Sequence, residues 1–178
     1  LKHGGLLIAP SKLGLYFSES LPNVPAGSIE RLRRDVVRVQ NGDSVQIGEL
    51  LDTVLEELLL FDKQQWQKGS AVDASWSLRG IAGSSIKPRR IWLGHNGTVL
   101  PVFVDLIGTG EERTTSGGRD ATGGVRLGIG RSKRTVAQVI EWLRGKNLKV
   151  AICTNGRQWR LIHAGSEYDA FCEWDIYL

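Results

Sequence analysis

Two Asn-Gly dipeptides, Asn96-Gly97 and Asn155-Gly156, each lie between two apolar runs that alternate with other residues. Such a pattern is the strongest short-range signal for a β-hairpin, because a two-residue type I′ turn needs positive φ angles that Asn tolerates and Gly adopts freely. The sequence therefore predicts hairpins over 89–107 and 151–165. Pro101 has no N–H to donate, so it predicts that its strand lies at an edge or is bulged there.

Two segments near the N-terminus have a helical period instead. Residues 29–39 follow Ser28, a suitable N-cap, and place four apolar residues on one stripe: Ile29, Leu32, Val36 and Val39. Residues 44–61 repeat apolar side chains at i, i+3 and i+4, which is typical of a core helix. Its stripe consists of Ile47, Leu50, Leu51, Val54, Leu55, Leu58 and Leu59.

A third helix is predicted after a glycine-rich stretch. Residues 108–130 are rich in glycine and poor in apolar residues, which indicates a long loop ending in a short strand near Val125–Ile129. Thr135 with Gln138 then forms a capping box, and Gly145 ends the helix after a basic residue. These elements predict an α/β fold, a mixed sheet with flanking helices.

The chain is expected to form one compact unit. Residues 1–85 are predicted to be a helical region packed on the core, and residues 86–178 a sheet region. No run approaches the roughly 18 apolar residues of a bilayer span, so no membrane partner and a cytoplasmic location are expected. The 178 residues include no methionine, and we expect a fragment of a longer polypeptide.

Basic residues gather in short clusters, with a net charge of +4 and a pI near 9.3. Arg31, Arg33, Arg34 and Arg38 fit a solvated helix face better than a binding surface. Two other clusters suit a DNA phosphate or a plain charged loop about equally, one before the first hairpin and one entering the third helix. Together with two arginines after the second turn, the candidate DNA-binding residues are Lys87, Arg89, Arg90, Arg131, Lys133, Arg134, Arg157 and Arg160.

The second turn also carries a family resemblance. Its residues are Thr154, Asn155, Gly156, Arg157, Trp159, Arg160 and Leu161. They resemble the strand that reads Leu-Thr-Asn-Gly, then an aromatic and a basic residue, in the N-terminal nuclease-like region of type I and type IIG restriction-modification polypeptides. Together with "GGLLIAP", "LLDTVLEELL" and "KPRRIWLGHNGTVLPVFVD", the chain looks like the N-terminal part of large adenine-specific methyltransferases of DISARM-type bacterial phage-defence systems.

That resemblance implies a PD-(D/E)XK-like fold, DNA as a partner, and a downstream methyltransferase domain that binds S-adenosylmethionine in the parent protein. Other subunits of the defence system are implied as possible partners. No cofactor is expected within this chain. Methylation of a flipped adenine uses an Asn/Asp-Pro-Pro-aromatic loop, and none of the five prolines here is followed by another.

The nuclease motif itself is incomplete. Asp105 stands where the second acid of such a core belongs, but Ile107 occupies the lysine position, and no lysine in the chain follows an acid by two residues. The remaining weak catalytic candidates, Glu111 and Glu112, lie in the glycine-rich segment, as does Asp120. The expectation is therefore a degenerate nuclease-like fold without a metal site.

Two alternatives stay open. One is an active Mg²⁺-dependent endonuclease with unconventional ligands, such as Asp105 with Glu111 or Glu112. The other is a scaffold that docks a partner subunit through Trp66, Trp76 and the apolar helix.

Trp159 is expected in the core, because tryptophan is mostly buried. Cys153 and Cys172 lack the spacing of a zinc site.

Overall fold

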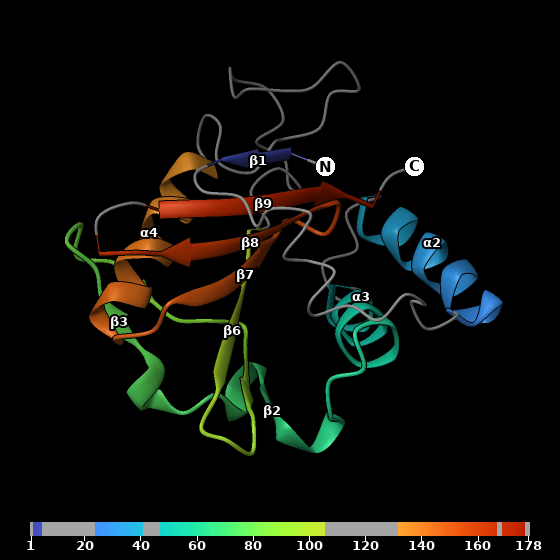
Figure 1. The fold of residues 1–178 in the computed structure, drawn as a ribbon, viewed down its shortest axis with the longest axis horizontal. Helices are drawn as coiled ribbons and strands as arrows, with labels where there is room; N and C mark the ends of the chain where they lie inside the picture. The colour runs from blue at the N-terminus through green and yellow to red at the C-terminus, as the bar shows by residue number, and fades with distance from the viewer. Residues whose placement is uncertain (1, 5–23, 41–46, 106–131, 167–168, 177–178) are drawn as a thin grey trace, which may run out of the picture.

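The structure, a computed structural model, describes residues 2–4, 24–40, 47–105, 132–166 and 169–176. These residues form a seven-stranded sheet in the order β1-β9-β8-β7-β6-β5-β2 (Figure 1). A separate two-stranded ribbon consists of β3 (Leu78–Arg79) and β4 (Ser85–Ile86). The strands of the large sheet are β1 (Lys2–Gly4), β2 (Trp66–Lys68), β5 (Arg90–Leu93), β6 (Val99–Val104), β7 (Val150–Thr154), β8 (Gln158–Ala164) and β9 (Asp169–Asp175).

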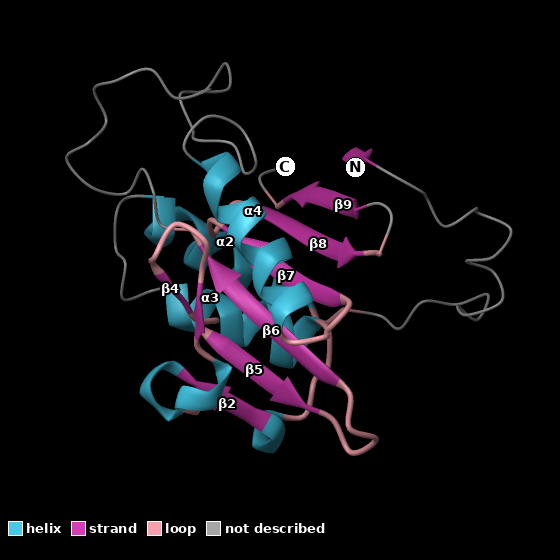
Figure 2. Cartoon of the chain, turned by 90° about the vertical axis from the view of Figure 1, so that its left-hand side faces the viewer, coloured by secondary structure: helices cyan, strands magenta, loops and turns pink. Residues whose placement is uncertain are grey.

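The sheet is mixed, as the sequence predicts. Strands β5 and β6 form an antiparallel hairpin, and β7, β8 and β9 form an antiparallel meander. The two units meet where β6 runs parallel to β7, and helix α4 (Ser132–Gly145) lies in the connection between them (Figure 2). The edge strands β1 and β2 both come from the first 85 residues, so that region contributes to the sheet as well as to the helices.

The two hairpins form where the sequence predicts them, but neither is closed by a two-residue type I′ turn. Gly97 and Gly156 have φ angles of 73° and 91°, whereas neither preceding asparagine has a positive φ. The first loop is longer than two residues, because its last register pair is Leu93 with Val99. In the second, the Asn155 N–H bonds to the Gln158 carbonyl at 3.2 Å, so the central residues are Gly156 and Arg157 instead of Asn155 and Gly156. The Asn155 carboxamide oxygen also accepts a hydrogen bond from the Gln158 N–H at 2.7 Å, so a side chain helps to close this turn.

At Pro101, strand β6 has a partner strand on one side only among the described residues, as predicted for a local edge. Strand β6 lies between β5 and β7, and Pro101 is paired with Ile91 on β5. The pairing with β7 begins one residue later, at Val102. The proline therefore precedes the residues of β6 that pair with β7, where its missing N–H costs least.

The apolar helix of residues 44–61 changes its period halfway. Helix α3 (Ile47–Asp52) continues into the π-helix η1 (Thr53–Leu58), in which the Leu59 N–H reaches the Val54 carbonyl at 3.0 Å. The wider π turn rotates the following side chains. Thr53 and Glu56 become buried, whereas Leu59 and Leu60 are exposed, so the predicted leucine stripe ends early.

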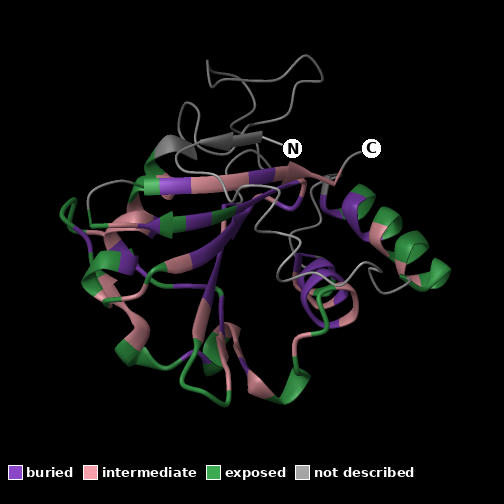
Figure 3. Cartoon of the chain, in the orientation of Figure 1, coloured by how far each residue is buried: buried purple, intermediate pink, exposed green. Residues whose placement is uncertain are grey.

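Helix α2 (Ala26–Gln40) starts two residues before the predicted N-cap. The Ser28 N–H bonds to the Pro25 carbonyl at 2.9 Å, and Ser28 is already inside the helix. Val36 and Val39 are buried, but Ile29 is exposed. Leu32 is partly buried against the same core cluster, so the predicted stripe packs on the core except at its first residue, near the exposed start of the helix (Figure 3).

Helix α4 begins at Ser132, so Thr135 is not its N-cap. At the other end, Asn147 has a φ of 54° and Leu148 N–H bonds to the Leu143 carbonyl at 2.8 Å, which is a Schellman motif with asparagine in the usual glycine place. Gly145 serves packing instead, because a Cβ there would lie 2.8 Å from Leu78 Cδ2.

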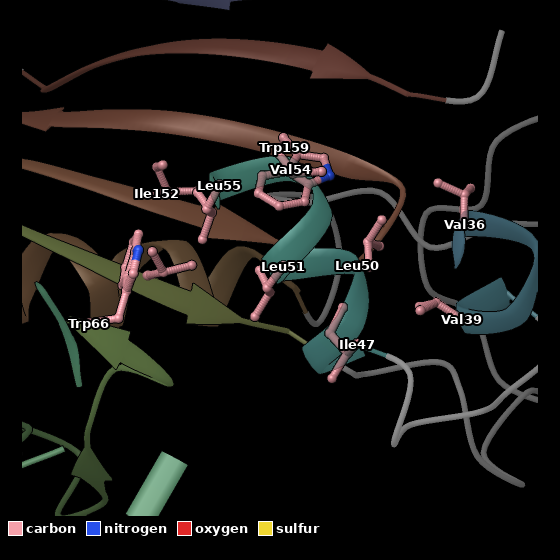
Figure 4. Packing of buried hydrophobic residues seen from close by; sticks show 11 residues of the cluster. Val36, Val39, Ile47, Leu50, Leu51, Val54, Leu55, Trp66, Ile152 and Trp159 are labelled. Carbon is pink, nitrogen blue, oxygen red and sulfur yellow. The ribbon is translucent and has the colours of Figure 1, made fainter. Parts of the chain in front are cut away.

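The core lies on both sides of the sheet. On the side covered by α2, α3 and η1, here called the α3 face, Trp159 is fully buried among helix and strand residues (Figure 4), as the sequence predicts. The opposite side, here called the α4 face, packs Phe103, Cys153 and Ile162 against Trp142. None of the described helices is both long and apolar enough to cross a bilayer.

Candidate nucleic-acid interface

A pocket of about 840 Å³ lies on the α4 face. Its walls come from strand β4 (Ser85–Ile86), the connection to β5, the end of β6 and the first half of α4. It brings together three residues that the sequence singled out, Lys87, Arg89 and Asp105. The full lining is Gly69, Ser85, Ile86, Lys87, Pro88, Arg89, Phe103, Val104, Asp105, Thr135, Gln138 and Val139.

Lys87 and Arg89 are the cations of this pocket. Side chains alternate along an extended chain, so Arg89 points to the α4 face and Arg90 to the α3 face. Both Lys87 and Arg89 are exposed. Among the described residues neither forms an ion pair or a hydrogen bond through its side chain. The charge of Lys87 contributes to lowering the pKa of the exposed Asp73, after the hydrogen bonds from Ser75, and Arg89 has no such neighbour in the described parts of the chain.

Asp105 lies in the pocket wall directly after β6 and is only 4% exposed. Its N–H bonds to the Thr154 carbonyl at 2.8 Å, which ties it to the end of β7. Burial first, and then the charge of Asp105, raises the pKa of the Cys153 thiol to about 12. Cys153 is therefore a neutral packing residue at neutral pH, and not a nucleophile.

A metal needs several convergent ligands, and within the described ranges no group of three His, Cys, Asp or Glu residues is close enough to hold one. Asp105 therefore belongs to no such group of ligands in this part of the chain. Glu111 and Glu112 lie outside the described residues. Of the metal ligands considered for an active nuclease, the structure therefore describes only Asp105.

Thr135 and Gln138 enter the pocket from α4. The sequence suggested them only as a capping box. Helix α4 starts earlier, at Ser132, so neither side chain is needed to cap it. The Gln138 amide donates to Ser84 Oγ at 3.0 Å, which holds the β3-β4 ribbon against the helix. Arg134 is exposed at the start of α4 but does not line the pocket. Arg131 and the side chain of Lys133 lie outside the described parts.

Arg79 is a cation that the sequence analysis missed. It ends strand β3 (Leu78–Arg79) and pairs with Ser85, a residue of the pocket lining. Arg79 is exposed and does not itself line the pocket. Nothing near it in the sequence marks it, because the strand is short and its segment reads as irregular.

Arg90 is not part of this surface. It is buried on the α3 face, where its guanidinium donates to Asp52 Oδ1 and to the Gly48 carbonyl, both at 2.6 Å. Lys68 bonds the same Asp52 oxygen at 2.7 Å and also pairs with Glu56. Burial alone would raise the pKa of Asp52, but the hydrogen bonds from Lys68 and Arg90 outweigh it and lower the pKa.

Arg157 and Arg160 connect the last two strands. Arg157 Nε lies 3.0 and 2.9 Å from the two carboxylate oxygens of Asp175. Arg160 Nε donates to Glu173 at 3.0 Å, and its guanidinium lies 4.1 Å from the centre of the Phe171 ring. Both side chains thus have structural partners on β9, and we leave them out of the candidate surface.

The residues proposed for a protein-docking scaffold are largely internal. Trp66 is buried on the α3 face, and Trp76 packs against Trp142 with ring centroids 6.1 Å apart. The apolar helix faces the core. In comparisons with known proteins, no family model, no curated protein and no solved structure matches the chain. A proposed role must therefore follow from the geometry of the pocket and from its charges.

Proposed function

We propose that this chain is a DNA-handling module of a bacterial restriction-modification or phage-defence methyltransferase, with a nuclease-like fold and no active site of its own. The pocket on the α4 face would receive backbone phosphates. S-adenosylmethionine and the methyl-transfer site would belong to a downstream domain of the parent polypeptide.

The observation that carries the proposal is the pair of exposed cations, Lys87 and Arg89, in the pocket. A charged side chain that only stabilises a fold usually has a partner, as Arg90 has on the other face. Cations without a partner gain the most from a phosphate, because each contact also releases condensed counterions from DNA. The polar groups of Thr135 and Gln138 beside them can donate hydrogen bonds to phosphate oxygens.

The sheet order also supports this reading. An antiparallel hairpin, a parallel step and an intervening helix place Asp105, at the end of β6, opposite the first half of α4. In a nuclease of the PD-(D/E)XK type an acid at the end of such a strand would bind the metal. If the fold is of this type, Asp105 would correspond to that acid, and Lys87 and Arg89 add positive charge to the same pocket.

The test is fluorescence anisotropy of a labelled duplex at about 50 and 200 mM salt. The double variant Lys87→Ala/Arg89→Ala is expected to reduce the slope of log K against log salt by about two, because each lost phosphate contact removes about 0.9. The matched control is Arg33→Ala/Lys63→Ala, which removes the same charge from exposed positions outside the pocket. Equal losses in both variants, or no binding by the wild type at low salt, would overturn the proposal.

A second candidate is a Mg²⁺-dependent endonuclease, favoured by the position of Asp105 beside Lys87 and Arg89. It predicts plasmid cleavage with Mg²⁺ that is lost in Asp105→Asn but retained in Asp169→Asn, an exposed carboxylate on β9. No cleavage by the wild type, or cleavage that Asp105→Asn leaves unchanged, argues against this candidate and for a binding role.

A further inference from the structure

The turn between β3 and β4 presents an isoleucine to solvent. Ile81 is 96% exposed, more than any other large apolar side chain of the described residues. A scattered exposed apolar residue needs no explanation in general. This one, however, lies in the turn of a ribbon whose second strand, β4, lines the candidate phosphate pocket.

The backbone of that turn is held in place. Gly83 N–H bonds to the Gly80 carbonyl at 2.8 Å, and Gly80 N–H bonds to the Ser84 carbonyl at 2.9 Å. The Ile81 N–H donates to the Glu141 carboxylate on α4 at 2.6 Å. A Cβ at Gly80 would lie 2.8 Å from Ile86 Cδ1, so the turn can approach the core only with glycine there. Ile81 is therefore presented from a fixed turn and not from a loose loop.

Exposed cations flank this turn. Arg79 precedes it on β3, and Lys87 and Arg89 follow β4. Apolar side chains that insert between base steps are found beside Lys and Arg residues that contact the neighbouring phosphates. These three cations outnumber the one carboxylate among the described residues that contacts the turn, Glu141, and their positive charge suits nucleic acid.

We propose that Ile81 is a wedge, which inserts between adjacent bases of the DNA whose phosphates contact Arg79, Lys87 and Arg89. The inference rests on the proposed DNA-handling function and extends it to a local distortion of the duplex. A turn already fixed before binding loses little conformational freedom when it inserts. Burial of the isoleucine side chain and the added phosphate contacts would offset the cost of unstacking.

The test uses short duplexes that carry 2-aminopurine at successive positions, because this base fluoresces more strongly when it is unstacked. With the 178-residue chain bound, fluorescence is expected to rise several-fold at one or two adjacent positions. Ile81→Ala is expected to abolish the rise and weaken binding about tenfold, with the salt slope unchanged. The matched control Val37→Ala, at a 51% exposed valine on α2, should behave as the wild type.

The possible outcomes distinguish a failure of the wedge proposal from a failure of the proposed DNA-handling function. Binding that depends on Lys87 and Arg89 without a fluorescence rise at any position would overturn the wedge and leave the DNA-handling role intact. No binding by the wild type would overturn both. If Ile81→Ala leaves the fluorescence rise unchanged but abolishes co-purification of a protein subunit, the turn is a protein contact and the wedge is wrong. A urea midpoint for Ile81→Ala equal to that of the wild type establishes that the fold is intact.

Discussion

Arg89 and Arg90 are adjacent in sequence and have opposite surroundings. Arg90 is buried on the α3 face and bound by Asp52, Glu56 and the Gly48 carbonyl. Arg89 is exposed on the α4 face, in a pocket with Lys87. The two arginines thus have different roles: Arg90 stabilises the fold on one side of the sheet, and Arg89 can contact a ligand on the other.

The two faces differ because of what covers them. On the α3 face, helix α3 and the π-helix η1 bring acidic side chains over β2 and β5, where they neutralise Lys68 and Arg90. On the α4 face, helix α4 covers β7 and β8 with apolar side chains but leaves the region between β4 and the end of β6 hollow. Arg90, which meets acidic side chains from a covering helix, is buried. Cations that border the hollow region of the α4 face stay exposed.

The largest expected effect breaks the contrast between the two arginines. Arg90→Ala should lower the free energy of unfolding by about 2 kcal/mol, because it removes a buried guanidinium that bonds Asp52 and the Gly48 carbonyl, while Lys68 still pairs with Asp52 and Glu56. Arg89→Ala should change it by less than about 0.5 kcal/mol, as surface substitutions usually do. Urea unfolding of both variants measures the difference. Similar losses in the two variants would contradict the assignment of Arg90 to the fold and Arg89 to the surface.

A second test compares the buried tryptophans of the two faces. The indole N–H of Trp142, on the α4 face, donates to the Trp76 carbonyl at 2.8 Å. That of Trp159, on the α3 face, has no hydrogen-bond partner among the described residues. Trp142→Phe should therefore cost about 1 kcal/mol more than Trp159→Phe, as thermal or urea unfolding can show. An equal cost would mean that the Trp142 hydrogen bond adds no net stability.

Leu60 offers a stabilising change on the α3 face. It follows the π-helix with a φ of 57° and is 71% exposed, so its side chain adds strain and little packing. Leu60→Gly should raise the free energy of unfolding by about 1 kcal/mol. Leu59→Gly is the control. Leu59 has a φ of −92°, and glycine there should destabilise the protein. Destabilisation by both changes would show that the turn needs the Leu60 side chain.

The smallest expected effect is a pH dependence specific to the α3 face. The pKa of Asp52 is lowered in the folded protein from its ordinary value of 3.8. The stability that this carboxylate contributes is thus present above pH 4 or so and is lost as the pH falls toward the folded pKa. Because its side chain is 44% exposed, solvent screens the effect. Urea midpoints at about pH 5 and 3 should differ less in Asp52→Asn than in the wild type. If the two urea midpoints of Asp52→Asn differ as much as those of the wild type, the Asp52 carboxylate does not contribute to the pH dependence of stability.

The sequence predicted the types of elements well, because periodicity records which side chains face a core. Both hairpins, the helices of α2 and α4 and the burial of Trp159 follow from it. It was wrong where a feature depends on exact backbone geometry. The type I′ turns and the N-caps at Ser28 and Thr135 depend on the exact positions of one or two residues. Sequence periodicity does not specify a position that precisely.

The candidate site was predictable in part. Lys87, Arg89 and Asp105 stand out in the sequence and meet in one pocket. Arg90 could not be separated from them, because its acidic partners Asp52 and Glu56 lie more than thirty residues earlier in the chain. Arg79 and Ile81 gave no signal, since a two-residue strand has no measurable period.

Periodicity in the sequence identified the two hairpins and the main helices, but not the short strands β1 to β4. The sequence also shows that neither a lysine two residues after an acid nor a Pro-Pro pair is present. Which basic residues remain accessible depends on the packing of the folded chain. Alternation along a strand sends neighbouring side chains to opposite faces, but which face is covered depends on helices that pack from elsewhere in the chain. Accessibility is thus a property of long-range packing, and local residue order cannot specify it.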